Sequence, residues 1–297
     1  MKPCNWTPGT EVRNVGVLDG GKASGSADDD KGEATWSRLE NPARSVLRGS
    51  DGQIKAVFTD GARLATLTGP ARTFTDWHAE YADSKEDDVF ATAFQYVAGA
   101  PQKKDDQGVA YAGDANFGPL NTTGAEGGDL RLAQSDFYDC LGLPYPFRDG
   151  QTGTPESMRA RSLDCSGFIR MVLGYRTRYP LMSSDTSGDG LPRTANGMAR
   201  SDEGADVLPL TGVGADARPS AIDQLQPGDL VFFKLDARTK ERLDHVGIVL
   251  GYDTEGHLIF VSSREEINGP TIGDVGGVSR LDGNGYYAKT LRSAKRL

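Results

Sequence analysis

The sequence of 297 residues has little of several things on which common protein functions depend. It contains only three cysteines and three histidines, and Asp and Glu outnumber Lys and Arg by 42 to 33, which gives a formal net charge of -9. A chain this acidic lacks the basic field that a nucleic acid or an anionic membrane surface requires. The cysteines, at positions 4, 140 and 165, do not follow metal-ligand spacing. We therefore expect no nucleic-acid partner, no metal and no other cofactor.

Long apolar stretches are also missing. No run approaches the roughly 18 residues of a membrane span, and the opening Met-Lys-Pro-Cys-Asn-Trp lacks the apolar core of a signal peptide. This start fits a piece of an exported protein or a cytoplasmic start. An odd number of cysteines leaves at least one thiol free, and the sequence does not decide whether Cys4 and Cys140 form a disulfide. What the chain has in abundance is glycine, with 38 residues, many beside Asp, which favours turns and short strands.

The order of polar and apolar stretches predicts four segments. Residues 1–30 are polar and predicted to be flexible. Residues 31–100 read as a small β-rich domain, with a hairpin in which 54–59 and 62–68 flank Asp60-Gly61. This domain carries no chemical motif, so we interpret it as a binding or positioning module. Residues 101–128 are rich in Gly, Asp and Pro and are predicted to be a linker. The second domain is predicted to cover 129–297.

The second domain places helices before strands. Its pattern predicts an amphipathic helix over 129–141 and a second helix from Cys165 to about Tyr175. A long polar insertion follows at 183–222, which we interpret as a flank or lid of the cleft or as a surface loop. Strands are then predicted at 229–234, 245–250 and 258–262, with a last one near 286–291. Helices followed by antiparallel strands define the α+β class.

Cys165 stands where an apolar helical pattern begins. Asp164 or Ser166 can cap that helix, which puts Cys165 in or beside the first turn. Unpaired N–H groups and the positive end of the helix dipole favour a thiolate there. The alternative is a small buried cysteine, the commoner case for a cysteine alone.

His245 opens a predicted strand 80 residues after Cys165. A lone histidine in a strand is usually structural. A cysteine at a helix N-terminus followed by a histidine at a strand start, however, fits the papain-type arrangement, in which the histidine serves the thiol and protonates the leaving amine.

Five segments resemble, in the same order, motifs of the NlpC-type cell-wall cysteine peptidases, which are papain-like enzymes. The resemblance covers about residues 129–297, over half of the chain. The segments are Leu141-Gly142-Leu143-Pro144-Tyr145, Asp164-Cys165-Ser166-Gly167-Phe168, Leu191-Pro192-Arg193-Thr194, Gln226-Pro227-Gly228-Asp229-Leu230 and His245-Val246-Gly247-Ile248.

The resemblance implies roles for these positions. Cys165 would be the nucleophile and His245 the base. Tyr145 would orient the substrate or stabilise the oxyanion, unless it is a turn aromatic packed on the core. Asp164 and Ser166 would line the subsite for the stem peptide of peptidoglycan, unless Asp164 is simply the helix cap. The usual bond joins D-glutamate, through its γ-carboxyl, to a diamino acid, which implies a secreted or wall-associated protein whose signal peptide lies outside this chain.

The third catalytic residue departs from the family pattern of His, Asn or Gln. Alignment of the strand puts Ser262 at that position, and we favour it over His257, because a turn at 253–256 leaves His257 at the far end of the hairpin from His245. Arg264 shares the face of Ser262. As a cation it cannot support a protonated histidine, but it could hold a substrate carboxylate.

Three functional hypotheses follow from the sequence. The first is a peptidoglycan hydrolase that works through a Cys165 thioester. The second is an amidase or acyl-transfer enzyme on the same fold. The third is a catalytically weak wall-binding protein, suggested by the unusual third residue.

Overall fold

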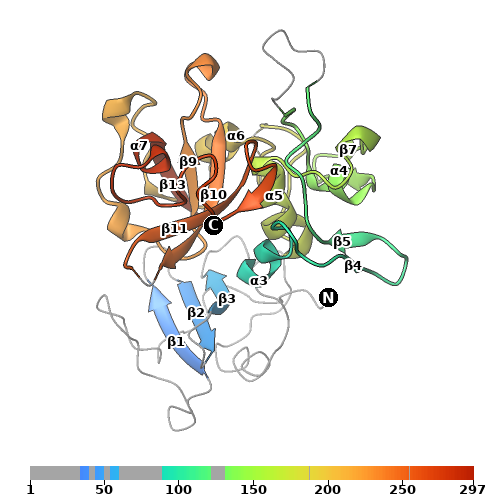
Figure 1. Cartoon of the computed structure of the whole chain (residues 1–297), viewed down its shortest axis with the longest axis horizontal. Coiled ribbons are helices and arrows are strands. Elements are labelled where there is room, and N and C mark those ends of the chain that lie inside the picture. Colours follow the sequence, from blue (N-terminus) through green and yellow to red (C-terminus); the bar gives the residue numbers. More distant parts are fainter. Residues whose placement is uncertain are drawn as a thin grey trace. The chain divides into compact units, whose positions relative to one another are not determined.

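The computed structural model describes three strands near the N-terminus and residues 89–121, 131–186, 188–253 and 255–297 (Figure 1). Its contacts divide the chain into two compact units, Met1–Thr92 with Leu297, and Ala93–Arg296. The predicted flexible segment 1–30 lies outside the described residues. In the described residues, no helix has the length and apolar character needed to cross a membrane.

The first unit contains a three-stranded antiparallel sheet. Strands β1 (Ala34–Leu39), β2 (Arg44–Gly49) and β3 (Ile54–Thr59) lie in this order. The second half of the hairpin predicted over 62–68 lies outside the described residues. A separate binding or positioning domain over 31–100 stays a prediction.

The second unit is built on a six-stranded antiparallel sheet in the order β12-β11-β10-β9-β13-β8. Its first four strands along the sheet form a meander, and β13 from the end of the chain fills the place between β9 and β8. The α+β prediction for this unit is confirmed. The strands are β8 (Ala205–Leu208), β9 (Leu230–Phe233), β10 (His245–Tyr252), β11 (Leu258–Arg264), β12 (Gly269–Thr271) and β13 (Leu291–Arg296).

A short central helix covers the middle of this sheet. Helix α5 (Cys165–Ile169) lies against β10 and β11 and continues as a π-helix over Arg170–Arg176, close to the predicted end at Tyr175. Phe168 and Ile169 are fully buried, so the apolar stripe seen in the sequence is the face that packs. A second apolar cluster contains residues of β9, β10 and β11 together with Tyr287 and Leu291.

The remaining elements are short. The helices are α3 (Val89–Phe94), α4 (Phe137–Leu141), α6 (Ala195–Arg200), α7 (Tyr286–Thr290) and 3-10 turns at Ser157–Arg159, Ala215–Ala217, Ile222–Gln224 and Ala237–Thr239. Two hairpins join β4 (Lys103–Lys104) to β5 (Ala110–Ala112) and β6 (Tyr145–Pro146) to β7 (Thr152–Gly153).

The helix predicted over 129–141 is much shorter in the structure. Gln134 has a left-handed backbone with a φ of 81°, which a helix interior does not allow. Asp136 then caps the helix, and its side chain accepts a hydrogen bond from the N–H of Phe137. The helix therefore begins only at Phe137.

The prediction of a strand near 286–291 was also wrong. Residues Tyr286–Thr290 form α7, and the strand β13 starts at Leu291. Tyr287 and Leu291 both bury their side chains in the second cluster. A spacing of four residues is typical of a helix, but the sequence pattern of this segment did not distinguish a helix from a strand.

Two segments predicted to be irregular carry structure. The described part of the predicted linker, up to residue 121, belongs to the second unit and contains β4 and β5. Asn116 bonds by its N–H to the Arg161 carbonyl and by its own carbonyl to the Leu163 N–H. The insertion 183–222 contains α6 and the edge strand β8. Both segments add backbone hydrogen bonds to the unit that holds Cys165.

Candidate active site

Cys165 is the first residue of α5, as the sequence predicted. Its thiol donates to the Asp244 carbonyl at a Sγ–O distance of 3.8 Å, and the Val246 N–H faces the same sulfur. These two backbone groups flank His245. The structure thus brings Cys165 to the start of β10, where His245 lies.

Asp164 is the cap of this helix. Its Oδ1 accepts from the Gly167 N–H at 2.6 Å and from Ser166 Oγ at 3.0 Å. Its Oδ2 accepts from the Gln134 N–H at 2.7 Å and from Arg193 at 2.8 Å. Because its two oxygens already accept these bonds and the residue is buried, the contacts are those of a structural cap.

Two guanidinium groups lie behind the cap, that of Arg170 fully buried and that of Arg193 partly exposed. Arg193 also bonds Ser166 Oγ at 2.7 Å and lies 3.3 Å from Asp136. The side chains of Asp136 and Arg170 are completely buried and joined by an ion pair at 3.0 Å. The charges of two carboxylates and two guanidinium groups therefore balance around the start of α5. We call these four residues the helix-side network (Asp136, Asp164, Arg170 and Arg193).

Gly167 allows the helix to approach the preceding chain. A Cβ at this position would lie 2.1 Å from the Ser135 carbonyl oxygen, closer than any real contact. Ser135 also accepts the Asp164 N–H at 2.9 Å through that carbonyl. Close backbone contact of this kind requires glycine.

His245 is buried at the start of β10. Its ring lies 5.7 Å from that of Phe233 and 5.5 Å from that of Tyr287, between ring centres. Its Nε2 has no hydrogen-bond partner among the described residues. The base expected from the sequence therefore lies beside the backbone groups that contact the thiol, and no polar group in the described residues bonds its Nε2.

Ser262 and Arg264 lie on β11. Ser262 Oγ accepts from Arg264 Nε at 3.2 Å. The Arg264 Nη atoms donate to the carbonyls of a loop, at Gly273, Val275 and Gly277, and to Ser279 Oγ. The role of Ser262 in orienting His245 stays a prediction, and its hydroxyl oxygen accepts this bond from Arg264.

His257 and Tyr145 lie in other surroundings. His257 is half exposed and bonds Asp282 through Nδ1 at 2.8 Å. It sits beside the hairpin turn, because its carbonyl accepts the Asp253 N–H, while His245 is at the opposite end of β10. The Tyr145 ring packs edge-on against Phe137 with 4.8 Å between ring centres, as a turn aromatic packed on the core does.

Burial dominates the electrostatics of the thiol and the imidazole. It raises the pKa of Cys165 to about 12, with a further contribution from the Asp164 charge. It lowers the pKa of His245 to about 3, aided by the Arg264 cation and opposed by the Asp164 charge. For Asp164, burial opposes ionisation, but the Arg193 charge outweighs it and holds the pKa below its usual range. Burial therefore disfavours the charged form of both the thiol and the imidazole.

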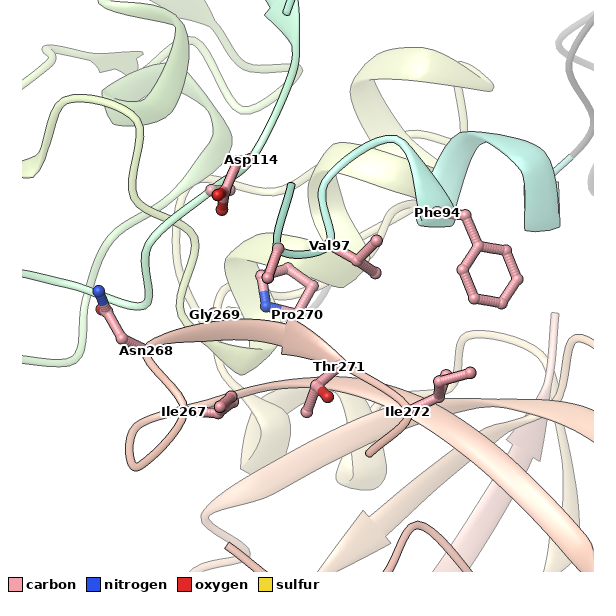
Figure 2. Close-up of a pocket in the computed structure, with 11 residues that line it drawn as sticks. Phe94, Val97, Asp114, Ile267, Asn268, Gly269, Pro270, Thr271 and Ile272 are labelled. Atoms are coloured by element: carbon pink, nitrogen blue, oxygen red, sulfur yellow. The ribbon is translucent and has the colours of Figure 1, made fainter. Parts of the chain in front are cut away.

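A hollow at the edge of the sheet is separate from this site (Figure 2). It has a cavity volume of about 230 Å³, and β12 forms part of its wall. The lining residues are Phe94, Val97, Ala98, Asp114, Ala115 and 267–272, none of them a predicted site residue. In the described residues, no group of three or more His, Cys, Asp or Glu is arranged to hold a metal ion.

Sequence reasoning missed Arg193 and Tyr287. Arg193 was noted only inside the Leu-Pro-Arg-Thr segment, and the sequence gives no sign that it pairs with a carboxylate 29 residues earlier. Tyr287 lies in the stretch predicted to be a strand. Its ring contacts His245, and burial raises the pKa of its hydroxyl to about 12.

Comparison with known proteins decides the family. The sequence model of the NlpC/P60 family matches residues 142–295, which include Cys165 and His245. The chain belongs to the NlpC/P60 family. Members of this family are generally cell-wall peptidases, usually cysteine peptidases or amidases, and the resemblance read from the five motifs is confirmed.

Solved NlpC/P60 structures are distant relatives. An NlpC/P60 family protein from Bacillus cereus ATCC 10987 is 23% identical, with 46% of this chain and 32% of that chain covered and a TM-score of 0.27. A Staphylococcus aureus Mu50 protein described as similar to lipoprotein, NLP/P60 family, is also 23% identical, with 54% and 38% covered and a TM-score of 0.27. The chain thus spans about a third of the length of these proteins. No curated protein matches it.

Proposed function

We propose that this chain is a peptidoglycan hydrolase that cuts an amide bond of the stem peptide with Cys165. The observation that carries the proposal is the position of the Cys165 thiol at the N-terminus of α5, against the backbone on both sides of His245. The family match adds the cell wall as the place of action. The proposed bond joins D-glutamate, through its γ-carboxyl, to the diamino acid.

The proposed reaction has two halves. Sγ attacks the amide carbonyl carbon as its proton passes to His245, and the C–N bond breaks while His245 returns the proton to the leaving amine. Water then attacks the resulting thioester, so that the carboxylate leaves and the thiol is restored. The first N–H groups of α5 face the developing oxyanion. No cofactor takes part in these steps. The proposed partner is the stem peptide of peptidoglycan, and the protein that cuts it would be secreted or associated with the cell wall.

Digestion of purified muropeptides, read by mass spectrometry, tests this function. We expect the wild type to release new fragments whose masses identify the bond, and Cys165→Ala and His245→Ala to release none. Cys140→Ala is the matched control, because Cys140 is also a free cysteine whose pKa burial raises to about 12, but it lies on α4. Loss of cleavage in Cys140→Ala alone would contradict the assignment.

One observation favours a second candidate function. Nε2 of His245 has no partner in the described chain, and Ser262 bonds Arg264, so the base lacks the support that the family pattern provides. This would suit a wall-binding protein with little turnover. Binding of the wild type to insoluble peptidoglycan without any release of fragments would favour it, whereas fragments with a transferred acyl group would favour an amidase or acyl-transfer enzyme.

A further inference from the structure

The loop that joins β9 to β10, residues 234–244, ends directly before His245. Its last residue, Asp244, donates its N–H to the Phe233 carbonyl at 3.1 Å. The carbonyl of Asp244 accepts from the Cys165 thiol at a Sγ–O distance of 3.8 Å. The main chain of this residue is therefore a point at which the sheet touches the nucleophile.

The Asp244 carboxylate binds the start of the same loop. Oδ1 accepts the Leu235 N–H at 2.6 Å, and Oδ2 accepts the Asp236 N–H at 2.9 Å. Oδ2 also lies 2.7 Å from Thr239 Oγ1 and 3.5 Å from Lys234 Nζ. Hydrogen bonds to an ionised acceptor are stronger than those between neutral groups, and this side chain is only 15% exposed. One carboxylate thus holds two backbone N–H groups, a hydroxyl and an ammonium group.

The other end of the loop is held from outside by α6, which lies next to β9 and β10 (Figure 1). Asn196 Oδ1 accepts the Leu243 N–H at 3.1 Å, and Arg200 Nη2 donates to the Glu241 carbonyl at 2.9 Å. Arg200 Nε also donates to Asn196 Oδ1 at 3.1 Å, which links these two contacts. The segment 241–243 therefore has its own support, and the part of the loop nearer to β9 depends on Asp244.

Asp236 offers a contrast within the same loop. Its carboxylate accepts the Arg238 N–H at 2.8 Å and pairs with the Arg238 guanidinium at 3.0 Å, and its side chain is 35% exposed. These contacts stabilise the 3-10 turn that Asp236 caps. Those of Asp244 instead join the turn to the residue whose carbonyl touches Sγ.

We propose that Asp244 is a positioning residue for the reaction of Cys165. Its carboxylate fixes the main chain at the entrance of β10, and this main chain holds the thiol at its place beside His245. The inference rests on the proposed function for its use in catalysis and on the geometry alone for its effect on the thiol. Because Asp244 acts through its own carbonyl, loss of the carboxylate slows the chemical step and leaves substrate binding nearly unchanged.

The kinetics of muropeptide cleavage compare the two acidic residues of the loop. We expect Asp244→Ala to lower kcat at least about tenfold, because the displaced carbonyl no longer holds the thiol, and to leave KM within about threefold of the wild type. Asp236→Ala is the matched control, and we expect its kcat to stay within about twofold of the wild type. An unchanged kcat in Asp244→Ala, or an equal loss of kcat in both variants, would overturn the proposal.

Thr239 provides a milder test that stays informative if Asp244→Ala does not fold. Thr239→Val removes the hydroxyl from Asp244 Oδ2 with little change in shape, and Thr239→Ser keeps a hydroxyl there. We expect kcat to fall at least about threefold in Thr239→Val and to stay within about twofold of the wild type in Thr239→Ser. Equal kcat values in these two variants would contradict the positioning role.

Alkylation of Cys165 tests the same contact without peptidoglycan. Iodoacetamide labelling is read by mass spectrometry on the peptide that contains Cys165, so that other thiols do not contribute. Because the Asp244 carbonyl covers part of the thiol, we expect labelling near neutral pH to be at least about threefold faster in Asp244→Ala and within about twofold of the wild type in Asp236→Ala.

The two readouts separate this inference from the proposed function. Equal labelling of Asp244→Ala and wild type would overturn the inference even if the wild type cleaves muropeptides. Faster labelling in Asp244→Ala but not in Asp236→Ala, together with no cleavage by the wild type, would support the inference and contradict the proposed function alone.

Discussion

The two sides of the candidate active site are built in opposite ways. On the helix side, the Asp164 carboxylate accepts hydrogen bonds at both oxygens and two guanidinium groups balance two carboxylates. On the sheet side, Nε2 of His245 has no partner in the described chain, and Arg264 forms no ion pair there, although the Asp274 charge acts on it. The comparison shows that this protein fixes the position of the nucleophile firmly and leaves the base with little support.

The largest effect should come from breaking the helix-side network. We expect Asp136→Asn to lower the free energy of unfolding by about 3–5 kcal/mol, because it leaves buried Arg170 without its charge partner. Urea unfolding followed by circular dichroism measures this change. As a control, Arg238→Gln removes an exposed guanidinium from an ion pair and should cost at most about 1 kcal/mol. A cost below 1 kcal/mol for Asp136→Asn would mean that the network adds nothing to stability.

On the sheet side, we expect a smaller effect, a loss of stability as the pH falls. Because the pKa of His245 is about 3 when folded and the unfolded value is about 6.5, the unfolded chain binds the proton more readily between these values. Stability should therefore fall as the pH drops through this window, by up to about 1.4 kcal/mol per pH unit. We expect His245→Gln to show a shallower slope from pH 6.5 to pH 4 in thermal melts, while Cys140→Ala keeps the slope of the wild type. Identical slopes for His245→Gln and wild type would contradict the neutral, buried base.

Two buried serines provide a matched pair across the site. Ser166 bonds both Asp164 and Arg193, so Ser166→Ala should cost about 1–3 kcal/mol. In the described chain the Ser262 side chain bonds only Arg264, and Ser262→Ala should cost about 1 kcal/mol. We expect muropeptide cleavage by Ser262→Ala to stay within about threefold of the wild type. A tenfold loss of kcat in Ser262→Ala with unchanged stability would instead make Ser262 the residue that supports His245.

The parts of the fold that depend on local pattern could be predicted from the sequence. The apolar stripe after Cys165 gave the helix, and the runs at 229–234, 245–250 and 258–262 gave three neighbouring strands of the sheet. The errors lie where tertiary structure overrides that pattern. Gln134 takes a left-handed backbone inside a segment with helical periodicity, and Tyr287 and Leu291 are buried at a spacing of four in a segment that also alternates.

The candidate site could be predicted only as far as its order along the chain. Cys165 and His245 were identified because each stands at the start of an element, which a sequence can show. Their electrostatic surroundings could not be identified, because they depend on contacts between residues far apart in the sequence. Arg193 bonds Asp164, 29 residues earlier, and the guanidinium of Arg264 bonds the loop at 273–279. The burial of Asp164 likewise could not be predicted, because a sequence motif does not show how much of a side chain is exposed to solvent.

The smallest effect is expected from substitution of His257. A negligible effect would support the contrast between the helix side and the sheet side of the site. His257 is chemically attractive as a partner for His245, but it bonds Asp282 beside the hairpin turn, at the opposite end of β10 and β11 from the thiol. The pair is partly exposed, so water screens it, and we expect His257→Gln to cost at most about 1 kcal/mol and to leave cleavage within about twofold of the wild type. Asp282→Asn, on the other side of the same bond, should behave alike. A tenfold loss of kcat in His257→Gln but not in Asp282→Asn would show that His257 reaches the base, and that the sheet side has a partner for His245 after all.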